Sequence, residues 1–395
     1  MRRYIIILYT AVLFALSSCV YTYEASVDSE EGRLVVEGDI VAGGVSTFTV
    51  SETVGLESGV STKSATCSIW IEDSEGRTYG SKTDVKSSFS IDTPYEEGLQ
   101  YRLWVVERTG QRRTFCTEFA EAYESPELSN LRVDVGDSQV VVRFDAALNP
   151  ASPYIRWNFT ERWEYHADYN AEIYYYQAVT ASGSKVDAYG EYDSDCPTYW
   201  CWNSDEGVAR SGSADGMESL ELKGGALRTI PRTSKKVQTL YWTGMEARTV
   251  SKEAYDYFSA VDEASSSTGD FFSPTPNAIM GNIRCADGSP EALVGYVSVV
   301  RPSTSLSKFF QNSQYMMYNA SAPNDEVNLF DPTSAEEADL SLFEHYNYLG
   351  NRPVLYVDGK AMWAPRRCID CTSELGGGTS FGTKNKPADW PDDNI

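Results

Sequence analysis

The sequence predicts a mainly β protein in two parts, with one clear helix. Apolar and polar residues alternate with period two in most segments, which is typical of strands with one buried face. Gly, Asp and Ser residues separate these segments at intervals of roughly eight to twelve residues, as in small antiparallel sandwiches. We expect an immunoglobulin-like β-sandwich over residues 20–124. A larger β-rich domain with long loops and a helix near 251–264 should occupy residues 125–395.

The first 19 residues predict a lipoprotein signal peptide. Two arginines precede an apolar run over residues 4–16, and Leu-Ser-Ser then leads into Cys19. These are the features of a secretory signal, and the run is shorter than the roughly 20 residues that a membrane-spanning helix needs. Because Leu-Ser-Ser-Cys resembles a lipobox, we expect Cys19 to carry palmitate and to anchor the chain in a membrane. The alternative is an ordinary signal peptide that happens to contain a cysteine.

The composition describes an acidic protein with enough apolar residues to form a core. The 395 residues include 33 basic and 57 acidic side chains, which gives a net charge of −24, and 42% are hydrophobic. Such a chain repels the phosphates of nucleic acids and the anionic headgroups of lipids. We therefore expect no nucleic-acid partner, and a membrane contact made through the lipid anchor.

Seven cysteines follow Cys19, and an oxidising compartment favours their pairing. Because seven is odd, at least one has no partner within the chain. The possible disulfide cysteines are Cys67, Cys116, Cys196, Cys201, Cys285, Cys368 and Cys371. The last two form a Cys-x-x-Cys pair, which is either a redox pair or, as the compartment favours, a structural disulfide or part of two separate bridges.

In the first domain, four segments have the alternation of strands: residues 34–41, 47–51, 67–72 and 101–106. Asp-Ser-Glu-Gly at 73–76 predicts a turn rather than a calcium site.

After a boundary near residues 124–127, the sequence predicts a hairpin over 131–144 and a longer strand over 155–165. Five apolar residues share one parity in the longer strand and should face the core: Ile155, Trp157, Phe159, Trp163 and Tyr165. Glu161 has the same parity, which we interpret as a bulge or a strand end. Further on, Ser251 is a suitable N-cap for the predicted helix.

Residues 181–216 are rich in Ser, Gly, Asp and Tyr and are expected to form a long loop. We predict that four aromatic residues of this loop bind a partner, because Tyr and Trp are rigid anchors. They are Tyr192, Tyr199, Trp200 and Trp202. A Cys196–Cys201 or Cys201–Cys285 bridge would hold the loop in place. Tyr174-Tyr175-Tyr176 is a second candidate, and the alternative is that these side chains fold down onto the sandwich.

Few residues offer catalytic or metal chemistry. The chain has two histidines, His166 and His345, which excludes zinc sites with several histidine ligands, and the common nucleotide-binding motifs are missing. We therefore expect no metal site and no cofactor. Asp and Glu are abundant, so the sequence does not exclude a catalytic carboxylate pair of the glycosidase type. No motif identifies which residues would form it.

Several motifs together resemble a known family. Residues 368–371 read Cys-Ile-Asp-Cys, 376–379 read Gly-Gly-Gly-Thr, and 386–391 read Lys-Pro-Ala-Asp-Trp-Pro. Leu-Val-Val-Glu-Gly at 34–38 and Cys-Trp at 201–202 precede them in the same order as in that family. The chain resembles the DUF4249 family, lipoproteins of Bacteroidota with no established activity. This resemblance implies an outer-membrane location, on the periplasmic or the surface-facing side, often in the company of TonB-dependent transporters.

These observations predict a membrane-anchored, non-enzymatic binding or accessory lipoprotein of the cell envelope. Its expected partner is a TonB-dependent outer-membrane transporter, or another envelope protein, and its expected role is nutrient capture with an unspecified ligand. The alternative is a cell-envelope hydrolase that acts on glycan or peptide through a carboxylate pair.

Overall fold

The computed structural model describes residues 32–54, 63–108, 112–266, 281–319, 329–331, 347 and 350–391. The predicted signal peptide with Cys19, and His345, lie outside these residues. The described chain is mainly β, with one long helix, α2 (Lys252–Ser266), and a single-turn helix, α3 (Asn312–Tyr315), so the predicted fold class is confirmed. None of the described helices has both the length and the apolar character needed to cross a bilayer. The 3₁₀ turns are η2 (Lys235–Val237), η5 (Arg366–Cys368) and η6 (Cys371–Ser373).

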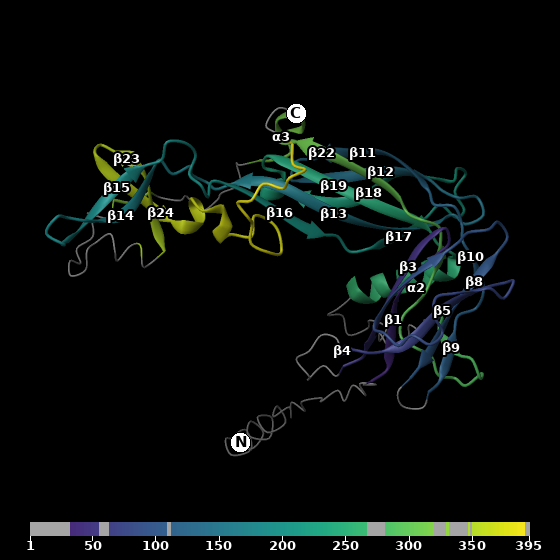
Figure 1. The fold of residues 1–395 in the computed structure, drawn as a ribbon. Helices are drawn as coiled ribbons and strands as arrows, with labels where there is room; N and C mark the ends of the chain where they lie inside the picture. The colour runs from purple at the N-terminus through teal and green to yellow at the C-terminus, as the bar shows by residue number, and fades with distance from the viewer. Residues whose placement is uncertain are drawn as a thin grey trace, which may run out of the picture.

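The N-terminal module consists of two sheets that share one hydrophobic core (Figure 1). The first sheet contains β1 (Leu34–Gly38), β3 (Gly44–Glu52), β4 (Lys63–Ser64) and β7 (Ser88–Thr93). The second contains β20 (Arg284–Cys285), β9 (Thr114–Cys116), β8 (Gln100–Glu107), β5 (Cys67–Asp73), β6 (Thr78–Tyr79) and β10 (Ala120–Glu121). Side chains of both sheets, such as Phe48 and Val105, fill the core. The immunoglobulin-like arrangement of these sheets stays a prediction.

Residues 281–300 belong to the N-terminal module although they follow the central strands in the sequence. Strand β20 pairs with β9, and β21 (Val299–Val300) pairs in parallel with β2 (Ile40–Val41). Val294 also exchanges two backbone hydrogen bonds of 3.0 Å with β1. The chain therefore leaves this module near the expected boundary at residue 124 and returns to it at 281.

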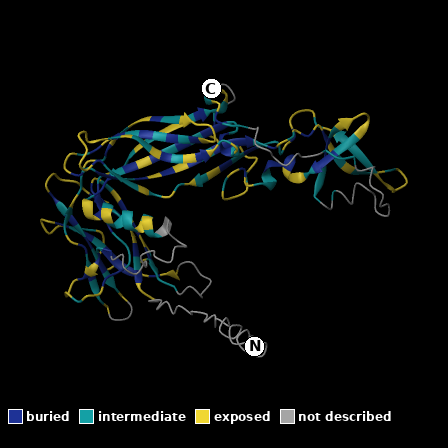
Figure 2. Cartoon of the chain, turned by 180° about the vertical axis from the view of Figure 1, so that it is seen from behind, coloured by how far each residue is buried: buried dark blue, intermediate teal, exposed yellow. Residues whose placement is uncertain are grey.

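The central module is built from the longest strands. One sheet has the order β11 (Glu127–Val135), β12 (Gln139–Ala147), β18 (Glu221–Pro231). The other has the order β16 (Trp200–Glu206), β13 (Tyr154–His166), β19 (Leu240–Thr249), β22 (Thr304–Gln311), and β17 (Arg210–Ser213) also pairs with β13. Buried and exposed residues alternate along these strands, as Figure 2 shows, because successive side chains point to opposite faces.

Strand β13 confirms the predicted core face, since all five of its expected apolar residues are buried. Glu161 lies on the same face and is only 1% exposed, in an unbroken register with β19. The interpretation of Glu161 as a bulge or a strand end is therefore wrong, and a buried partner explains it below.

Two β-hairpins form a distal module, at the opposite end of the central module from the N-terminal module (Figure 1). Strand β14 (Ile173–Val179) pairs with β15 (Lys185–Glu191), and β23 (Asn351–Val357) pairs with β24 (Lys360–Pro365). The turn of the second hairpin is Asp358-Gly359, with φ angles of 48° and 77°, as a two-residue hairpin loop requires. The hairpins and η5 share a small core.

The expected long loop over residues 181–216 is wrong, because β15, β16 and β17 occupy much of it. Residues of β15 are exposed or only half-buried on both faces. A strand in this position needs few apolar residues, so its composition resembles that of a loop.

Helix α2 begins where the sequence predicts. The Ser251 hydroxyl accepts a 3.2 Å hydrogen bond from the Ala254 backbone N–H, which is an N-cap contact. Ala254 is buried, and the rings of Tyr257 and Phe258 lie 4.9 and 5.7 Å from that of Tyr296. The helix therefore packs against the returning segment of the N-terminal module.

Candidate functional site

Glu161 is buried with a cationic partner. Lys236, from η2, is 2% exposed, makes an ion pair with Glu161, and donates a 2.8 Å hydrogen bond to Asp205. The Tyr241 hydroxyl donates a second bond, of 2.9 Å, to Glu161. Burial raises the pKa of Asp205, but hydrogen bonds from Lys236 and Thr379 outweigh it and leave this pKa below its usual value. Asp205 is therefore not arranged to hold a proton for acid catalysis, and both carboxylates are committed to contacts within the module.

The C-terminal segment, residues 366–391, is fixed onto the central module by polar contacts. The Thr379 hydroxyl donates a 2.7 Å hydrogen bond to Asp205. At the end of the segment, the Trp390 indole N–H donates a 3.0 Å bond to Glu164, which also accepts from Trp202 at 3.2 Å. Glu164 is 7% exposed, so these two donors compensate a carboxylate that is largely removed from water.

Close backbone approach explains the glycines of the C-terminal segment. Gly376 has a φ of +56°, and a Cβ atom there would lie 2.3 Å from Cζ of Tyr165. A Cβ on Gly378 would lie 2.9 Å from Trp163. The Trp163 indole N–H and the Tyr165 hydroxyl each donate a 2.8 Å bond to a carbonyl of this segment. The Gly-Gly-Gly-Thr motif therefore serves packing, because only glycine lets the backbone lie on these rings.

A disulfide joins the C-terminal segment to β16, between Cys201 and Cys371. Neither the Cys196–Cys201 nor the Cys201–Cys285 bridge forms, so both expectations are wrong. The cysteines without a disulfide partner in the described chain are Cys67, Cys116, Cys196, Cys285 and Cys368. Cys371 is part of a structural disulfide, and burial raises the pKa of the Cys368 thiol, so the two do not form a reactive pair.

The four aromatic residues predicted to bind a partner lie in different environments. Tyr199 and Trp200 both pack on the ring of His166, with centroids 5.0 and 5.3 Å away. Trp202 contacts Glu164 as described, and Tyr192 lies beside the Tyr174 ring of the distal hairpins. The structure thus brings Tyr199 and Trp200 together, and Tyr199 and Tyr192 both pack against the small core of the distal module. Their role in binding stays a prediction.

His166 has a structural environment. Its Nδ1 lies 2.7 Å from the Ala167 carbonyl, and burial lowers its pKa, so the ring is neutral at physiological pH. Among the described residues, no group of three or more His, Cys, Asp or Glu side chains is arranged to hold a metal ion.

Two exposed tyrosines mark the outer face of the distal module. Tyr174 and Tyr176 share one face of β14 and are 41% and 44% exposed, whereas Tyr175 packs inward. The Tyr174 ring lies 5.0 Å from the Tyr192 ring and covers Gly190, its partner in the opposite strand. We call Tyr174, Tyr176 and Tyr192 the distal aromatic surface. Its rings are held by neighbours before any partner arrives.

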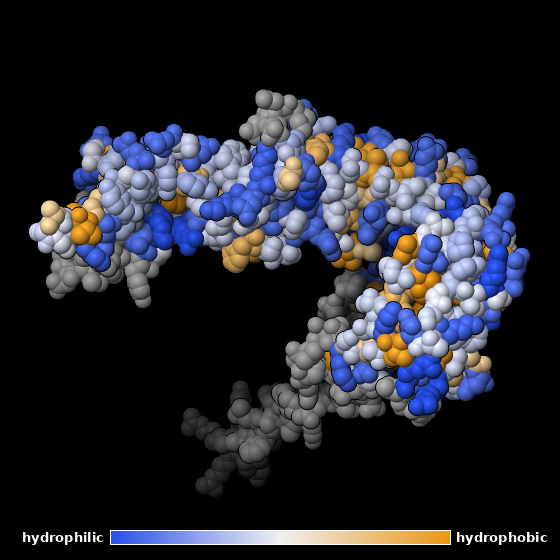
Figure 3. Space-filling view, viewed as in Figure 1, coloured by the Kyte–Doolittle hydropathy of each residue, from blue (hydrophilic) through white to orange (hydrophobic). Residues whose placement is uncertain are grey.

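A hollow of about 590 Å³ lies beside the distal aromatic surface, with Arg352 on its rim. Burial raises the pKa of Tyr192 to about 12, so this hydroxyl stays neutral. At the outer end of the hairpin formed by β14 and β15, Val179 and Val186 are 69% and 46% exposed. Figure 3 shows apolar residues gathered at this end of the molecule. This combination of aromatic faces and exposed aliphatic groups suits binding.

The comparison with protein families concerns most of the chain. A model described as a domain of unknown function, DUF4249, matches residues 20–305, more than two thirds of the sequence. The chain belongs to the DUF4249 family. The match ends before the C-terminal segment, so the closing motifs of this DUF4249 protein lie beyond it. No curated protein matches the chain.

The sequence analysis did not predict the hairpin of β23 and β24, and it did not single out Arg352, which lies on β23. Residues 351–365 carry Leu-Tyr-Val, then Asp358-Gly359, then Ala-Met-Trp. An Asp-Gly pair between apolar runs is a strong hairpin signal, and it locates β23 and β24. That these strands pack beside β14 is not visible locally, because the two hairpins are far apart in the sequence.

Proposed function

We propose that this DUF4249 protein is a membrane-anchored, non-enzymatic binding or accessory lipoprotein that works with a TonB-dependent outer-membrane transporter in nutrient capture. The observation that carries the proposal is the distal aromatic surface. Tyr174 and Tyr176 are exposed side by side at the end of the molecule opposite the N-terminal module. Tyrosines in such positions are typical energetic centres of protein interfaces.

The orientation of Tyr174 favours binding energetically. Its ring already packs against Tyr192 and over Gly190, so a partner has little side-chain freedom to remove. Removing a central tyrosine from an interface costs about 2 kcal/mol, or roughly 30-fold in affinity.

The charged groups of the central module support binding rather than hydrolysis. Asp205 and Glu161 share Lys236, Arg228 lies 3.4 Å from Glu161, and Glu164 accepts bonds from two indoles. A glycosidase acid needs a carboxyl whose pKa is raised and whose proton is free to transfer. Burial does raise the pKa of Glu374, but Lys235 holds this carboxylate at 2.6 Å. A lipid tether adds to the proposal, because it raises the effective concentration of the protein near its membrane partners.

The test is crosslinking and affinity purification of the tagged native lipoprotein from membranes. The double variant Tyr174→Ser/Tyr176→Ser should lose an envelope partner that the wild type retains. Tyr95→Ser is the matched control, because Tyr95 is 38% exposed but lies in the N-terminal module. Thermal unfolding should be similar for all three proteins.

Retention of the same partner by the folded double variant would remove the distal aromatic surface from the proposal. Wild-type protein that recovers no envelope partner, and that turns over a glycan or peptide, would replace the binding role by the hydrolase alternative.

A further inference from the structure

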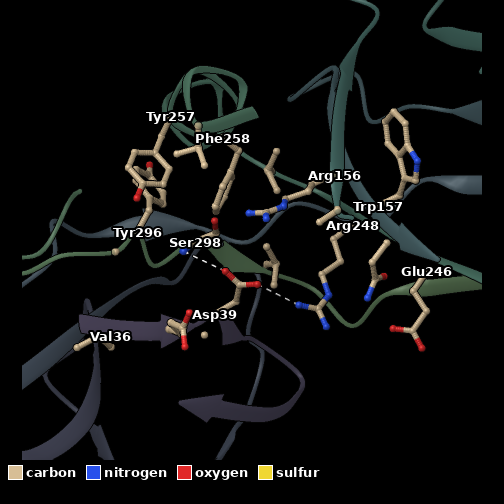
Figure 4. A pocket seen from close by; sticks show the side chains of 18 of the residues that line it. Val36, Asp39, Arg156, Trp157, Glu246, Arg248, Tyr257, Phe258, Tyr296 and Ser298 are labelled. Carbon is tan, nitrogen blue, oxygen red and sulfur yellow. Dashed lines mark hydrogen bonds and ion pairs between the residues drawn. The ribbon is translucent and has the colours of Figure 1, made fainter. Parts of the chain in front are cut away.

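A cleft of about 500 Å³ lies where the N-terminal and central modules meet (Figure 4). Its walls come from six separate stretches of the chain: β1 and residue 39, β13, Ala209, β19 with Val250, α2, and the returning segment 294–300. This volume is within the range of small-molecule sites, which often occur between domains.

Two arginines lie directly opposite each other on one wall of the cleft. Arg156 on β13 is the register partner of Arg248 on β19. Like charges in this position repel each other. Arg248 is neutralised by Asp39, with 3.1 Å between Nη1 and Oδ2. The Asp39 carboxylate also accepts a bond from the Ser298 backbone N–H, so it is committed to these two partners.

The guanidinium of Arg156 makes no ion pair or hydrogen bond with any residue in the described parts of the chain. Its guanidinium carbon lies 3.3 Å from the centre of the Phe258 ring, on α2. Burial lowers the pKa of Arg156, although Asp39 and Asp262 act against this at longer range. Keeping a half-buried cation without a direct counter-ion costs free energy. An anion that pairs with this guanidinium would recover part of that cost.

The remaining walls provide an aromatic chamber and one polar group. Tyr257, Phe258 and Tyr296 contact one another with centroids 4.9 to 5.7 Å apart. Ser298 is 4% exposed, and its hydroxyl has no hydrogen-bond partner among the residues that the structure describes. Figure 4 shows Ser298 and Arg156 facing the same part of the cleft, beside Phe258.

We propose that this cleft is a binding site for a small aromatic monocarboxylate. The carboxylate would pair with the guanidinium of Arg156 and accept a hydrogen bond from the Ser298 hydroxyl, and the ring would lie among Tyr257, Phe258 and Tyr296. A single negative charge fits better than a dianion such as phosphate, because Glu37, Asp39 and Glu246 also line the cleft and repel additional negative charge.

The test is isothermal titration calorimetry of the complete mature protein with phenylacetate as the probe, and with phenylacetamide as its neutral isostere. Wild-type protein should bind the acid at least tenfold more tightly than the amide. Arg156→Gln should remove this preference, and Ser298→Ala should weaken binding of the acid several-fold. Lys223→Gln is the control, since Lys223 is highly exposed on the central module and pairs only with Glu221.

Arg156→Gln removes a charge without a direct counter-ion and also its contact with the Phe258 ring. Thermal unfolding of this variant is therefore measured as well, so that loss of binding is distinguished from loss of folding. Equal binding of acid and amide, unchanged binding in Arg156→Gln, or no heat of binding up to about 10 mM phenylacetate would each overturn the proposal. The site is independent of the distal aromatic surface, so either proposal can fail without the other.

Discussion

Replacing both Cys201 and Cys371 by alanine should lower the free energy of unfolding by about 3–5 kcal/mol. The disulfide closes a loop between residues 170 positions apart. For a loop of this length, the chain-entropy relation gives about 5 kcal/mol at 25 °C. Residual structure in the unfolded chain reduces the measured value, so 5 kcal/mol is the upper end.

The assay is urea unfolding of the purified protein, followed by fluorescence and by circular dichroism. Cys196→Ala/Cys368→Ala is the matched control, because both cysteines are buried in the neighbouring small core and neither is bonded. The control should cost about 1–2 kcal/mol for the lost packing. A reductant should destabilise the wild type and leave the Cys201→Ala/Cys371→Ala variant unchanged. A loss below about 1 kcal/mol in that variant, or equal losses in both double variants, would refute the reasoning.

Four further results are expected. Gly376→Ala should destabilise the protein by about 1–3 kcal/mol in urea unfolding, because a Cβ atom would collide with Tyr165. Gly288 also has a positive φ but lies in open space, so Gly288→Ala should cost about 1 kcal/mol. Equal losses of stability in the two variants would contradict this. Lys236→Met should cost about 3–5 kcal/mol, since it removes the buried cation that Glu161 and Asp205 share, and a neutral result would disprove the pairing. Hydrogen bonds from Asn130 and the Gly224 N–H lower the pKa of Asp145 to about 2. Its stabilising contribution should therefore be complete above its ordinary pKa of 3.8 and disappear as the pH falls to about 2, so acid titration of Asp145→Asn should lack this component. Finally, Cys19→Ala should abolish labelling by palmitate analogues and detergent-dependent membrane fractionation; persistence of both would exclude lipidation at this residue.

The elements that were predictable from the sequence are those with a strong local pattern. Strand β13 pairs with three strands, and its apolar residues between 155 and 165 share one parity, so its core face is evident from parity alone. Helix α2 is recognisable from the helical spacing of its apolar residues and from its N-cap at Ser251, both of which are visible within the segment itself. Glu161 broke the pattern because its partner, Lys236, is 75 residues away in a 3₁₀ turn that has no sequence signal.

The parts that were not predictable depend on contacts between distant segments. Strand β15 is half-exposed on both faces, so it lacks the apolar alternation that identifies a strand. Cys371 was named as a disulfide cysteine, but its pairing with Cys201 across 170 residues is not deducible from spacing. The cleft with Arg156 combines six stretches of the chain, none of which has a recognisable motif for ligand binding.

The binding role is tested most directly by photocrosslinking in intact cells. A photoreactive phenylalanine analogue at position 176 should form an adduct with an envelope protein, because Tyr176 lies on the distal aromatic surface. The same analogue at position 95, which has a similar exposure in the N-terminal module, should form none. Absence of an adduct at position 176, or identical adducts at both positions, would contradict the proposal that this surface binds a partner.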